Sequence, residues 1–281
     1  MDRQALKRRT PDPIWRSLSG TYWWWRNRGR HTLARSASLS WRRNLRRLEP
    51  YRDRHRGRRC FIIGNGPSLR RTDLTSLRNE FTFGLNRIYL LFPEMGFTTT
   101  YLVSVNELVL EQCAGEMLAL DLPRFVTWRA RGLFPDNPNI LFLDTDFTGP
   151  EEFSGDLAGR VYEGYTVTFV ALQLAFAMGF EQAILVGVDH NFETQGPPNT
   201  TVTSTGDDPN HFAPNYFGAG FRWQLPDLEG SERAYRLARD AYSAAGRQIL
   251  DATVEGKLTV FPKVDYSSLF THARTGQSTS G

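Results

Sequence analysis

The fold is decided by one stretch, Cys60-Phe61-Ile62-Ile63-Gly64-Asn65-Gly66-Pro67-Ser68-Leu69. Its apolar run ends at a glycine-rich turn, and a segment with a helical pattern follows through Leu77. This order predicts a first β-strand, a loop and a helix. Gly64 and Gly66 can adopt backbone angles that are closed to other residues, and they let a ligand approach the main chain.

The turn after this strand has two explanations. Free N–H groups of the loop and of the following helix would form an anion site, and Asn65 and Ser68 would add side-chain donors. On this interpretation the loop binds a nucleotide or a nucleotide sugar. The alternative is a strand–turn–helix joint without a ligand, and the sequence of the turn leaves both open.

Short apolar runs alternate with helical patterns from residue 60 onward, which indicates an α/β fold. We expect strands at 60–63, 81–85, 99–105, 123–128, 140–143, 183–188 and 258–261. We expect helices at 108–118, 166–178 and 229–250. The run 183–188 is apolar throughout, as a buried parallel strand is. The sequence therefore predicts a Rossmann-like, mostly parallel sheet flanked by helices, with a basic helical N-terminal extension.

The length of 281 residues and the 40% hydrophobic content suit one large domain. We expect a basic Trp/Arg-rich extension at 1–58, a Rossmann-like domain at 59–270 and a flexible tail at 271–281. Apolar runs stay short of the roughly 18–20 residues of a membrane-spanning helix, and the start lacks a signal-peptide pattern. Two cysteines make no disulfide framework, so we expect a cytoplasmic location.

Charge divides the chain into two unlike parts. Residues 1–59 hold 18 Lys and Arg against 4 Asp and Glu, a net +14, whereas the remainder carries −10. The first part also contains Trp23-Trp24-Trp25. Arginine with tryptophan suits an anionic membrane surface, so we expect peripheral attachment through residues 1–58. The alternatives are docking on the acidic body or on another subunit, and nucleic acid, which is not favoured because no helix-turn-helix or RNA-binding signature is present.

Polar residues recur where the predicted strands end. They are Asn65, Asn86, Asn106, Asp189 and His190. In an open parallel sheet, ligands bind outside the carboxyl ends of the strands. The repetition therefore predicts one site built from several strand ends.

A polar loop of about 30 residues, 191–220, carries His211. Loops of that length are uncommon in compact domains unless they are functional or disordered. Histidine exchanges protons near neutral pH, so His211 is the first candidate for a general base and His190 the second. Tyr216 and Tyr165 are candidates to steady a leaving phosphate. The alternative for each is a structural side chain with satisfied hydrogen bonds.

Asp144-Thr145-Asp146 has the D-x-D form with which many glycosyltransferases hold a divalent metal on a nucleotide diphosphate. Because Thr148-Gly149-Pro150 follows, a turn with Asx-type hydrogen bonds explains the triplet as well. Metal-binding Cys/His spacing is absent from the sequence. We therefore expect neither a metal site nor a cofactor, with Mg²⁺ as the alternative.

Several segments, taken in order, resemble the bacterial MptE-like Rossmann family, which is often found with surface-polysaccharide and flagellin-glycosylation functions. More distantly they are similar to the family 42 sialyltransferases, which use CMP-sialic acid without a metal. The resemblance spans about residues 58–270 and rests on Ile62–Leu69, Phe83–Leu90, Tyr101–Leu108, Thr166-Val167-Thr168, Met178-Gly179-Phe180, Gly187-Val188-Asp189-His190, Asn210-His211-Phe212 and Asn215-Tyr216-Phe217-Gly218.

The resemblance implies a nucleotide site and an activity. In the sialyltransferases the matching loop and the next two strand-end asparagines contact the donor. The implied nucleotide-binding residues here are Gly64, Asn65, Gly66, Ser68, Asn86, Asn106, Thr166 and Tyr216. The general base of those enzymes follows a Tyr-Ile-Gly sequence, but here Tyr216-Phe217-Gly218 is followed by Ala219, so His211 is the candidate substitute.

We therefore expect a metal-independent, sialyltransferase-like glycosyltransferase with a nucleotide-sugar donor and a glycan, lipid-linked or protein acceptor in surface-glycan assembly. His211 would deprotonate the acceptor, and Asp189 and His190 would shape the site. One alternative is an MptE-like pyrophosphokinase that uses ATP with Mg²⁺ held by Asp189 or by Asp144 and Asp146. Another is a non-catalytic nucleotide-binding protein of envelope assembly, and a homo-oligomer stays open.

Overall fold

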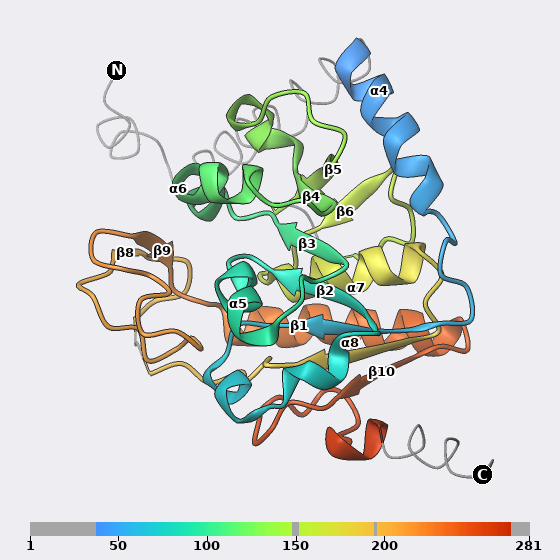
Figure 1. Ribbon diagram of the computed structural model, residues 1–281. Helices are drawn as coiled ribbons and strands as arrows, with labels where there is room; N and C mark the ends of the chain where they lie inside the picture. Colours follow the sequence, from blue (N-terminus) through green and yellow to red (C-terminus); the bar gives the residue numbers. More distant parts are fainter. Residues whose placement is uncertain (1–37, 148–151, 194–195, 271–281) are drawn as a thin grey trace, which may run out of the picture.

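The computed structural model describes residues 38–147, 152–193 and 196–270. Its centre is an eight-stranded, wholly parallel sheet in the order β10-β7-β1-β2-β3-β4-β5-β6 (Figure 1). The strands are β1 (Arg59–Ile63), β2 (Phe81–Leu85), β3 (Tyr101–Ser104), β4 (Arg124–Thr127), β5 (Ile140–Asp146), β6 (Arg160–Tyr162), β7 (Gln182–Val186) and β10 (Gln248–Asp251). The predicted Rossmann-like α/β class is confirmed.

Helices cover both faces of the sheet. They are α4 (Leu39–Leu48), α5 (Phe92–Met95), α6 (Glu107–Leu118), α7 (Val167–Ala177) and α8 (Leu228–Ala244). Strand β1 shows why both faces need cover, because all its apolar residues are fully buried. Cys60 and Ile62 belong to the core that contains α7 and α8, whereas Phe61 and Ile63 belong to the core that contains α6. Alternating side chains of one strand thus serve two cores.

The order of the strands fixes where a ligand would bind. From β1 the chain builds the sheet outward in sequence order to β6, and α7 then returns it to β7 on the other side of β1. The direction of winding therefore reverses between β1 and β7. In open α/β sheets the crevice at such a switch point, outside the carboxyl ends of the strands, is the usual ligand site.

Two predicted elements at the end of the chain are wrong. The helix expected through residue 250 ends at Ala244, because Gly246 has a φ of 70° and leaves the helical conformation. Residues 248–251 then pair with β7 as strand β10. The expected strand 258–261 does not form, although Leu258 is fully buried, because the free edge of β10 is met only by a single bridge from Asp251 to Lys263.

Two further departures lie in the loops. The segment after Gly66 forms two short 3₁₀ helices, Pro67–Arg71 and Leu74–Leu77, in place of one helix. The long polar loop carries part of an antiparallel hairpin, β8 (Thr201–Thr203) with β9 (Arg222–Gln224). Figure 1 shows this hairpin beyond the carboxyl end of β1. The loop is therefore a structured wall at the ligand-binding edge of the sheet.

Helix α4 belongs to the body of the molecule, although it lies in the expected extension. The Trp41 ring meets the Trp128 ring edge-on at 5.0 Å. The Asn44 amide bonds both backbone groups of Phe142, at 2.7 and 2.8 Å, and so covers the free edge of β5. Arg47 pairs with Asp136 at 2.8 Å. The predicted boundary after residue 58 therefore does not separate two bodies.

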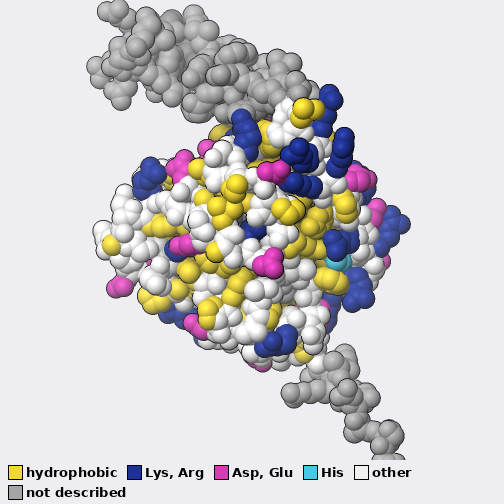
Figure 2. All heavy atoms as spheres, turned by 45° about the horizontal axis from the view of Figure 1, so that its top comes forward, with side chains coloured by type: hydrophobic (Ala, Val, Ile, Leu, Met, Phe, Trp, Pro, Cys, Tyr) yellow, Lys and Arg dark blue, Asp and Glu magenta, His cyan; other side chains and the backbone are white. Residues whose placement is uncertain are grey.

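The basic surface that was expected to face a membrane is only partly described. Figure 2 shows Lys and Arg side chains grouped at the end of the molecule where α4 lies. Among the described residues, no helix is both long and apolar enough to cross a membrane. The tryptophan cluster at residues 23–25 and the tail at 271–281 fall outside the described residues, so the expectations for them stay predictions.

Candidate functional site

The loops after β1 and β7 are packed directly against each other. The Gly66 N–H donates to the Gly187 carbonyl at 2.9 Å. A Cβ atom on Gly66 would lie 1.8 Å from Asp189 Oδ2, and one on Gly64 would lie 2.3 Å from the Gly187 oxygen. Gly66 has a φ of −69°, which any residue adopts. The expectation of unusual backbone angles is wrong for Gly66, and both glycines are required because another loop fills the space.

The donors expected at this turn are already engaged. The N–H groups of Gly64, Gly66 and Leu69 donate to backbone carbonyls. The fully buried Ser68 donates its N–H to Asp189 Oδ1 at 3.0 Å and its hydroxyl to Asp189 Oδ2 at 2.7 Å. Ser68 therefore ties the two loops together and lies outside the two cavities described below, so its predicted contact with a nucleotide stays a prediction. Burial raises the pKa of Asp189, although the bonds from Ser68 oppose that shift.

Asn65 lines a cavity of about 170 Å³ in the crevice between β1 and β7. Its Oδ1 atom is buried and has no hydrogen-bond partner within the described structure. A buried polar atom without a partner destabilises a protein. An amide oxygen only accepts hydrogen bonds. A ligand with a hydroxyl or an amine would therefore satisfy Asn65.

The first turn of α7 lines the same cavity through Thr166, Val167 and Thr168. Thr166 caps the helix, since its hydroxyl accepts a hydrogen bond from the Thr168 N–H at 3.3 Å. The first turn contains no acidic residue. Because a helix N-terminus carries a partial positive charge, this is the favoured position for an anionic group. The position that favours an anion is therefore the N-terminus of α7, at the predicted residue Thr166, and not the turn after β1.

His211 lines the small cavity and is held by two neighbours. Its Nδ1 lies 2.8 Å from Asp208 Oδ2, and Asp208 Oδ1 accepts from the Asn210 N–H at 3.0 Å. The imidazole stacks on the Tyr216 ring with centroids 4.1 Å apart and planes within 6°. Because a carboxylate only accepts, Nδ1 donates its hydrogen to Asp208, and in the neutral tautomer the lone pair is on Nε2. Nε2 has no hydrogen-bond partner among the described residues, so it is available as a base.

His190 lines the small cavity as well, in a second pair of a histidine with a carboxylate. Its Nε2 lies 3.1 Å from Glu232 Oε1, and its backbone has a φ of 54°. Non-glycine residues are uncommon in this left-handed region, where histidine is among the enriched exceptions. The structure thus brings both predicted histidines to the crevice that Asp189 also lines.

Tyr216 does not reach either cavity, contrary to its predicted contact with the nucleotide. Its ring is buried beneath His211, and its hydroxyl accepts a hydrogen bond from the Arg87 N–H at 3.3 Å. Burial raises the pKa of this hydroxyl. Tyr216 therefore positions His211. Phe212 completes the connection, because its N–H donates to the Asn65 carbonyl at 2.9 Å and fixes the histidine loop beside the crevice.

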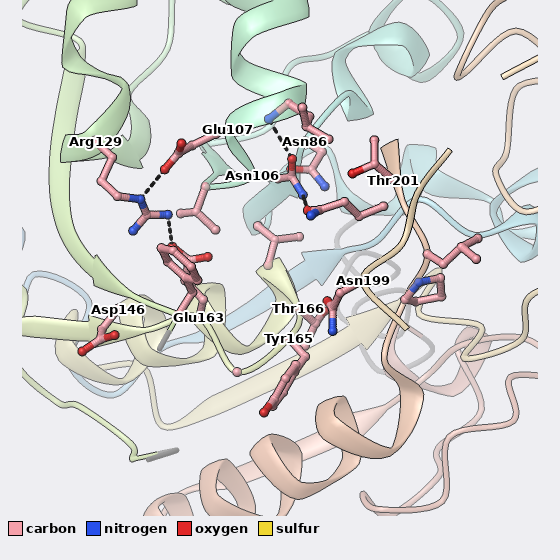
Figure 3. Close-up of a pocket in the computed structure, with 18 of the residues that line it drawn as sticks. Asn86, Asn106, Glu107, Arg129, Asp146, Glu163, Tyr165, Thr166, Asn199 and Thr201 are labelled. Carbon is pink, nitrogen blue, oxygen red and sulfur yellow. Dashed lines mark hydrogen bonds and ion pairs between the residues drawn. The ribbon is translucent and has the colours of Figure 1, made fainter. Parts of the chain in front are cut away.

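A wider cavity of about 750 Å³ adjoins the small one (Figure 3). Asn86 lines both cavities, with a left-handed φ of 47° and its Oδ1 bonded to the Ser104 hydroxyl at 3.0 Å. Asn106 lines the wide cavity only. Its Oδ1 caps α6 by accepting from the Leu108 N–H at 3.0 Å, and its Nδ2 donates to Gln224 at 3.3 Å. Much of its bonding capacity is therefore structural.

Arg129 was not predicted, yet it organises the wide cavity. It donates to Glu107 in the first turn of α6, to Glu163 before α7 at 2.6 Å, and to Thr145 on β5 at 2.8 Å. Figure 3 shows it between the two carboxylates. Asp208 was missed as well, although its position three residues before His211 was a usable signal. The sequence held no signal for Arg129, because its three partners, Glu107, Thr145 and Glu163, come from three separate segments.

The residues proposed as Mg²⁺ ligands do not fit a metal. Both oxygens of Asp189 accept hydrogen bonds from Ser68. Asp144 and Asp146 face Arg160, at 3.6 and 3.4 Å. In the part of the chain that the structure describes, no three His, Cys, Asp or Glu side chains are grouped to hold a metal ion.

The chain matches no known family and no curated protein, so the resemblance to the MptE-like family stays a prediction. Among solved structures it is similar to the MAf glycosyltransferase from Magnetospirillum magneticum AMB-1, with 14% identity and a TM-score of 0.48. That match covers 80% of this chain and 38% of the other. It is also similar to the sialyltransferase CstII from Campylobacter jejuni, solved with cytidine-5'-monophosphate. There the identity is 14% and the TM-score 0.42, over 74% of this chain and 85% of that one. Likenesses of this size assign no function, so the side chains of the site must carry the assignment.

Proposed function

We propose that this protein is a glycosyltransferase that uses a nucleotide-activated sugar and acts without a metal. The observation that carries the proposal is His211, which lines the crevice at the switch point and is held there by Asp208 and Tyr216. A partly buried histidine with a carboxylate on Nδ1 and an Nε2 without a partner among the described residues is the arrangement of a general base. The sialyltransferase likeness predicted from the sequence, with a CMP-linked donor, is the finer form of this proposal.

The small cavity supplies both kinds of contact that a nucleotide needs. The N-terminus of α7 favours the phosphate. The unpartnered Oδ1 of Asn65 accepts from a ribose hydroxyl or a base amine. At about 170 Å³ this cavity is smaller than a typical ligand pocket of roughly 300–1,000 Å³, so the transferred sugar lies at the junction with the wide cavity, where Asn86 and Thr166 line both.

The chemistry follows from these positions. Nε2 of His211 removes the proton of an acceptor hydroxyl as that oxygen attacks the anomeric carbon of the donor. The new glycosidic bond forms while the bond from the anomeric carbon to the phosphate oxygen breaks, and the nucleotide leaves with the electron pair. The helix N-terminus of α7 stabilises the negative charge on the departing phosphate. Asp208 stabilises the imidazolium that results.

A ligand screen tests the nucleotide part of the proposal. Thermal-shift measurements with CMP, UDP, GDP and ATP, each with and without Mg²⁺, should show stabilisation by one of them, by about 2.7 kcal/mol at 100 times its dissociation constant. Transfer from the matching nucleotide sugar should survive EDTA. Stabilisation by ATP that requires Mg²⁺ would instead favour the pyrophosphokinase, and binding without transfer would favour a non-catalytic protein.

Asn65 variants test where the nucleotide lies. Asn65→Leu removes a buried acceptor that lacks a partner in the free protein, so the variant should be as stable as the wild type or more stable. Its affinity for the nucleotide should fall by about 1–3 kcal/mol in calorimetry. Asn65→Asp keeps an acceptor in place and should retain most of the affinity if a hydroxyl or amine is bound. A loss in Asn65→Asp larger than in Asn65→Leu would mean that the phosphate contacts this side chain.

We also propose that the protein is cytoplasmic and attached to the membrane through its basic N-terminal segment. What supports this is the charge of the chain, +14 in residues 1–59, together with three successive tryptophans at 23–25. Trp41 and Arg47 on α4 contact the body, whereas Arg42 and Arg46 on the same helix are exposed and remain available to a membrane surface.

A further inference from the structure

Tyr165 occupies the junction of the two cavities. It lines both of them, together with Asn86, Thr166, Val167 and Pro226. Its side chain comes from the loop between β6 and α7, and Figure 3 shows it beside Asn199 of the long loop. A ligand that passes from the nucleotide crevice into the wide cavity must therefore pass this ring.

The backbone at Tyr165 is strained although its ring is only partly buried. Its φ is 64°, in the left-handed region that bulky residues rarely adopt, yet 45% of the residue is exposed. The burial of an apolar ring stabilises the fold and can offset the free-energy cost of a strained backbone, but the ring of Tyr165 is buried only in part. Strained residues that persist at a cavity are typical of functional sites.

Helix α8 holds the ring in this position. Gly230 makes room for it, since a Cβ atom there would lie 2.6 Å from the Tyr165 ring. The guanidinium carbon of Arg233 lies 5.5 Å from the ring centroid. The ring is thus supported by α8 and remains available to a ligand in the cavity.

The wide cavity presents acceptors and amides, and its positive charge is neutralised. Its acidic lining residues are Glu107, Glu111, Asp146 and Glu163, and its amides are Asn86, Asn106, Asn199 and Gln224. Arg129, the one cationic side chain among the described residues that line it, already bonds Glu107, Glu163 and Thr145. The other two carboxylates are paired with arginines that lie outside the lining, Asp146 with Arg160 and Glu111 with Arg222. A phosphate or carboxylate ligand would therefore find no unpaired guanidinium among the described lining residues, whereas a polyhydroxylated ligand would find acceptors for its hydroxyls.

We propose that the wide cavity is the acceptor subsite and that it takes a neutral saccharide, one pyranose ring of which stacks on Tyr165. The C–H groups on one face of a pyranose carry partial positive charge and pack on the negative face of an aromatic ring. Phe147, half exposed in the same cavity, offers a second ring farther from the crevice. This inference rests on the proposed glycosyltransferase function and specifies its acceptor.

The test is a glycan array that carries neutral oligosaccharides beside uronate-containing, sulfated and phosphorylated ones, probed with the full chain. Binding should be confined to neutral glycans. Tyr165→Phe should bind the neutral glycans as the wild type does. Tyr165→Gly should bind them more weakly, with a half-saturating concentration raised by about tenfold or more. The Tyr165→Gly protein should also melt at the same or a higher temperature, because glycine adopts a φ of 64° without strain.

Asp53→Gly is the matched control. Asp53 also has a left-handed φ, of 51°, and it lies against the carboxyl end of α7, away from the cavities. It should leave glycan binding unchanged. Strongest binding to acidic glycans, no binding to any glycan, or undiminished binding by Tyr165→Gly would each overturn the proposal. Metal-independent transfer from a nucleotide sugar in the same preparation would show that the proposed function survives such a failure.

Discussion

Asp208→Asn isolates the chemical role of the histidine pair, because it changes one charge and almost no volume. Asp208 is 4% exposed and does not line a cavity, so its effect on the donor passes through His211. The carboxylate accepts from Nδ1 at 2.8 Å and thereby leaves the lone pair on Nε2. An asparagine amide that donates to Nδ1 would hold the opposite tautomer, in which Nε2 carries the hydrogen and cannot accept a proton.

The expected loss can be bounded. A positioned general base contributes about 10²–10⁴ in rate. In a serine-protease triad the corresponding Asp-to-Asn change, with the geometry intact, lowers kcat by about 10⁴. We therefore expect kcat to fall by about 10²–10⁴ in Asp208→Asn, which corresponds to about 3–5 kcal/mol of transition-state stabilisation. The Asn210 N–H keeps an acceptor, so the free energy of unfolding should fall by no more than about 1–3 kcal/mol.

The assay is steady-state transfer with the donor that the ligand screen identifies, combined with calorimetry for donor affinity. Affinity should stay within about threefold of the wild type, because the substitution changes a residue outside the cavity. Glu232→Gln is the matched control, since Glu232 is the carboxylate partner of His190 at 3.1 Å. If Glu232→Gln loses rate by about 10² and Asp208→Asn does not, the reasoning is refuted and His190 becomes the base.

Three further predictions concern packing, pH and membranes. Gly66→Ala should lower the free energy of unfolding by more than about 3 kcal/mol in denaturant unfolding, because the new Cβ would lie 1.8 Å from Asp189 Oδ2. Gly115→Ala is the control, since a Cβ at this position on α6 meets open space, and it should raise the free energy of unfolding by about 0.5–1 kcal/mol. Burial lowers the pKa of His55 to about 4, from 6.5 in the unfolded chain. Between these two values the unfolded chain binds a proton that the folded protein does not, so the melting temperature should fall as the pH drops from 6.5 to 4. The fall should be less steep in His55→Phe. The full chain should sediment with anionic liposomes, and the bound fraction should fall as the salt concentration rises. A chain that begins at residue 38 should not sediment with them. If the full chain does not bind the liposomes at low salt, a subunit interface is the better explanation of the basic segment.

Strands β1 to β5 and β7 were predictable because they are apolar runs that end at polar residues, whereas β6 and β10 were not predicted. The buried strands β1 and β7 follow from their sequences almost residue for residue. What failed was decided by tertiary contact. Residues 248–251 continue a helical pattern but form a strand, because β7 offers them a free edge. Gly66 suggested a ligand, yet the atom that it accommodates belongs to Asp189. One sequence cannot distinguish a glycine that admits a ligand from one that admits a neighbouring loop.

Tertiary contacts also decide which of the predicted site residues line a cavity. Asn65, Asn86 and Thr166 reach the cavities because the ends of parallel strands and the start of α7 must meet at one edge of the sheet. Ser68 and Tyr216 do not, because their polar atoms are bonded to Asp189 and to the Arg87 backbone. The sequence shows that a side chain is polar and near the edge, but its partner depends on segments far away in the chain.

The two cavities differ in the way that a transfer between a charged donor and a neutral acceptor requires. The small one joins the positive end of α7 to a buried acceptor atom on Asn65, so it selects a ligand with both a phosphate and a hydroxyl or amine. In the wide cavity the guanidinium of Arg129 is paired with Glu107 and Glu163, so this cavity disfavours a second anion. His211 lines the small cavity, with Tyr165 at the junction, so the proton to be removed must belong to a hydroxyl that crosses that junction. The reaction therefore depends on the loop 191–226 and on the turn before α7, the segments with the least periodic sequence pattern.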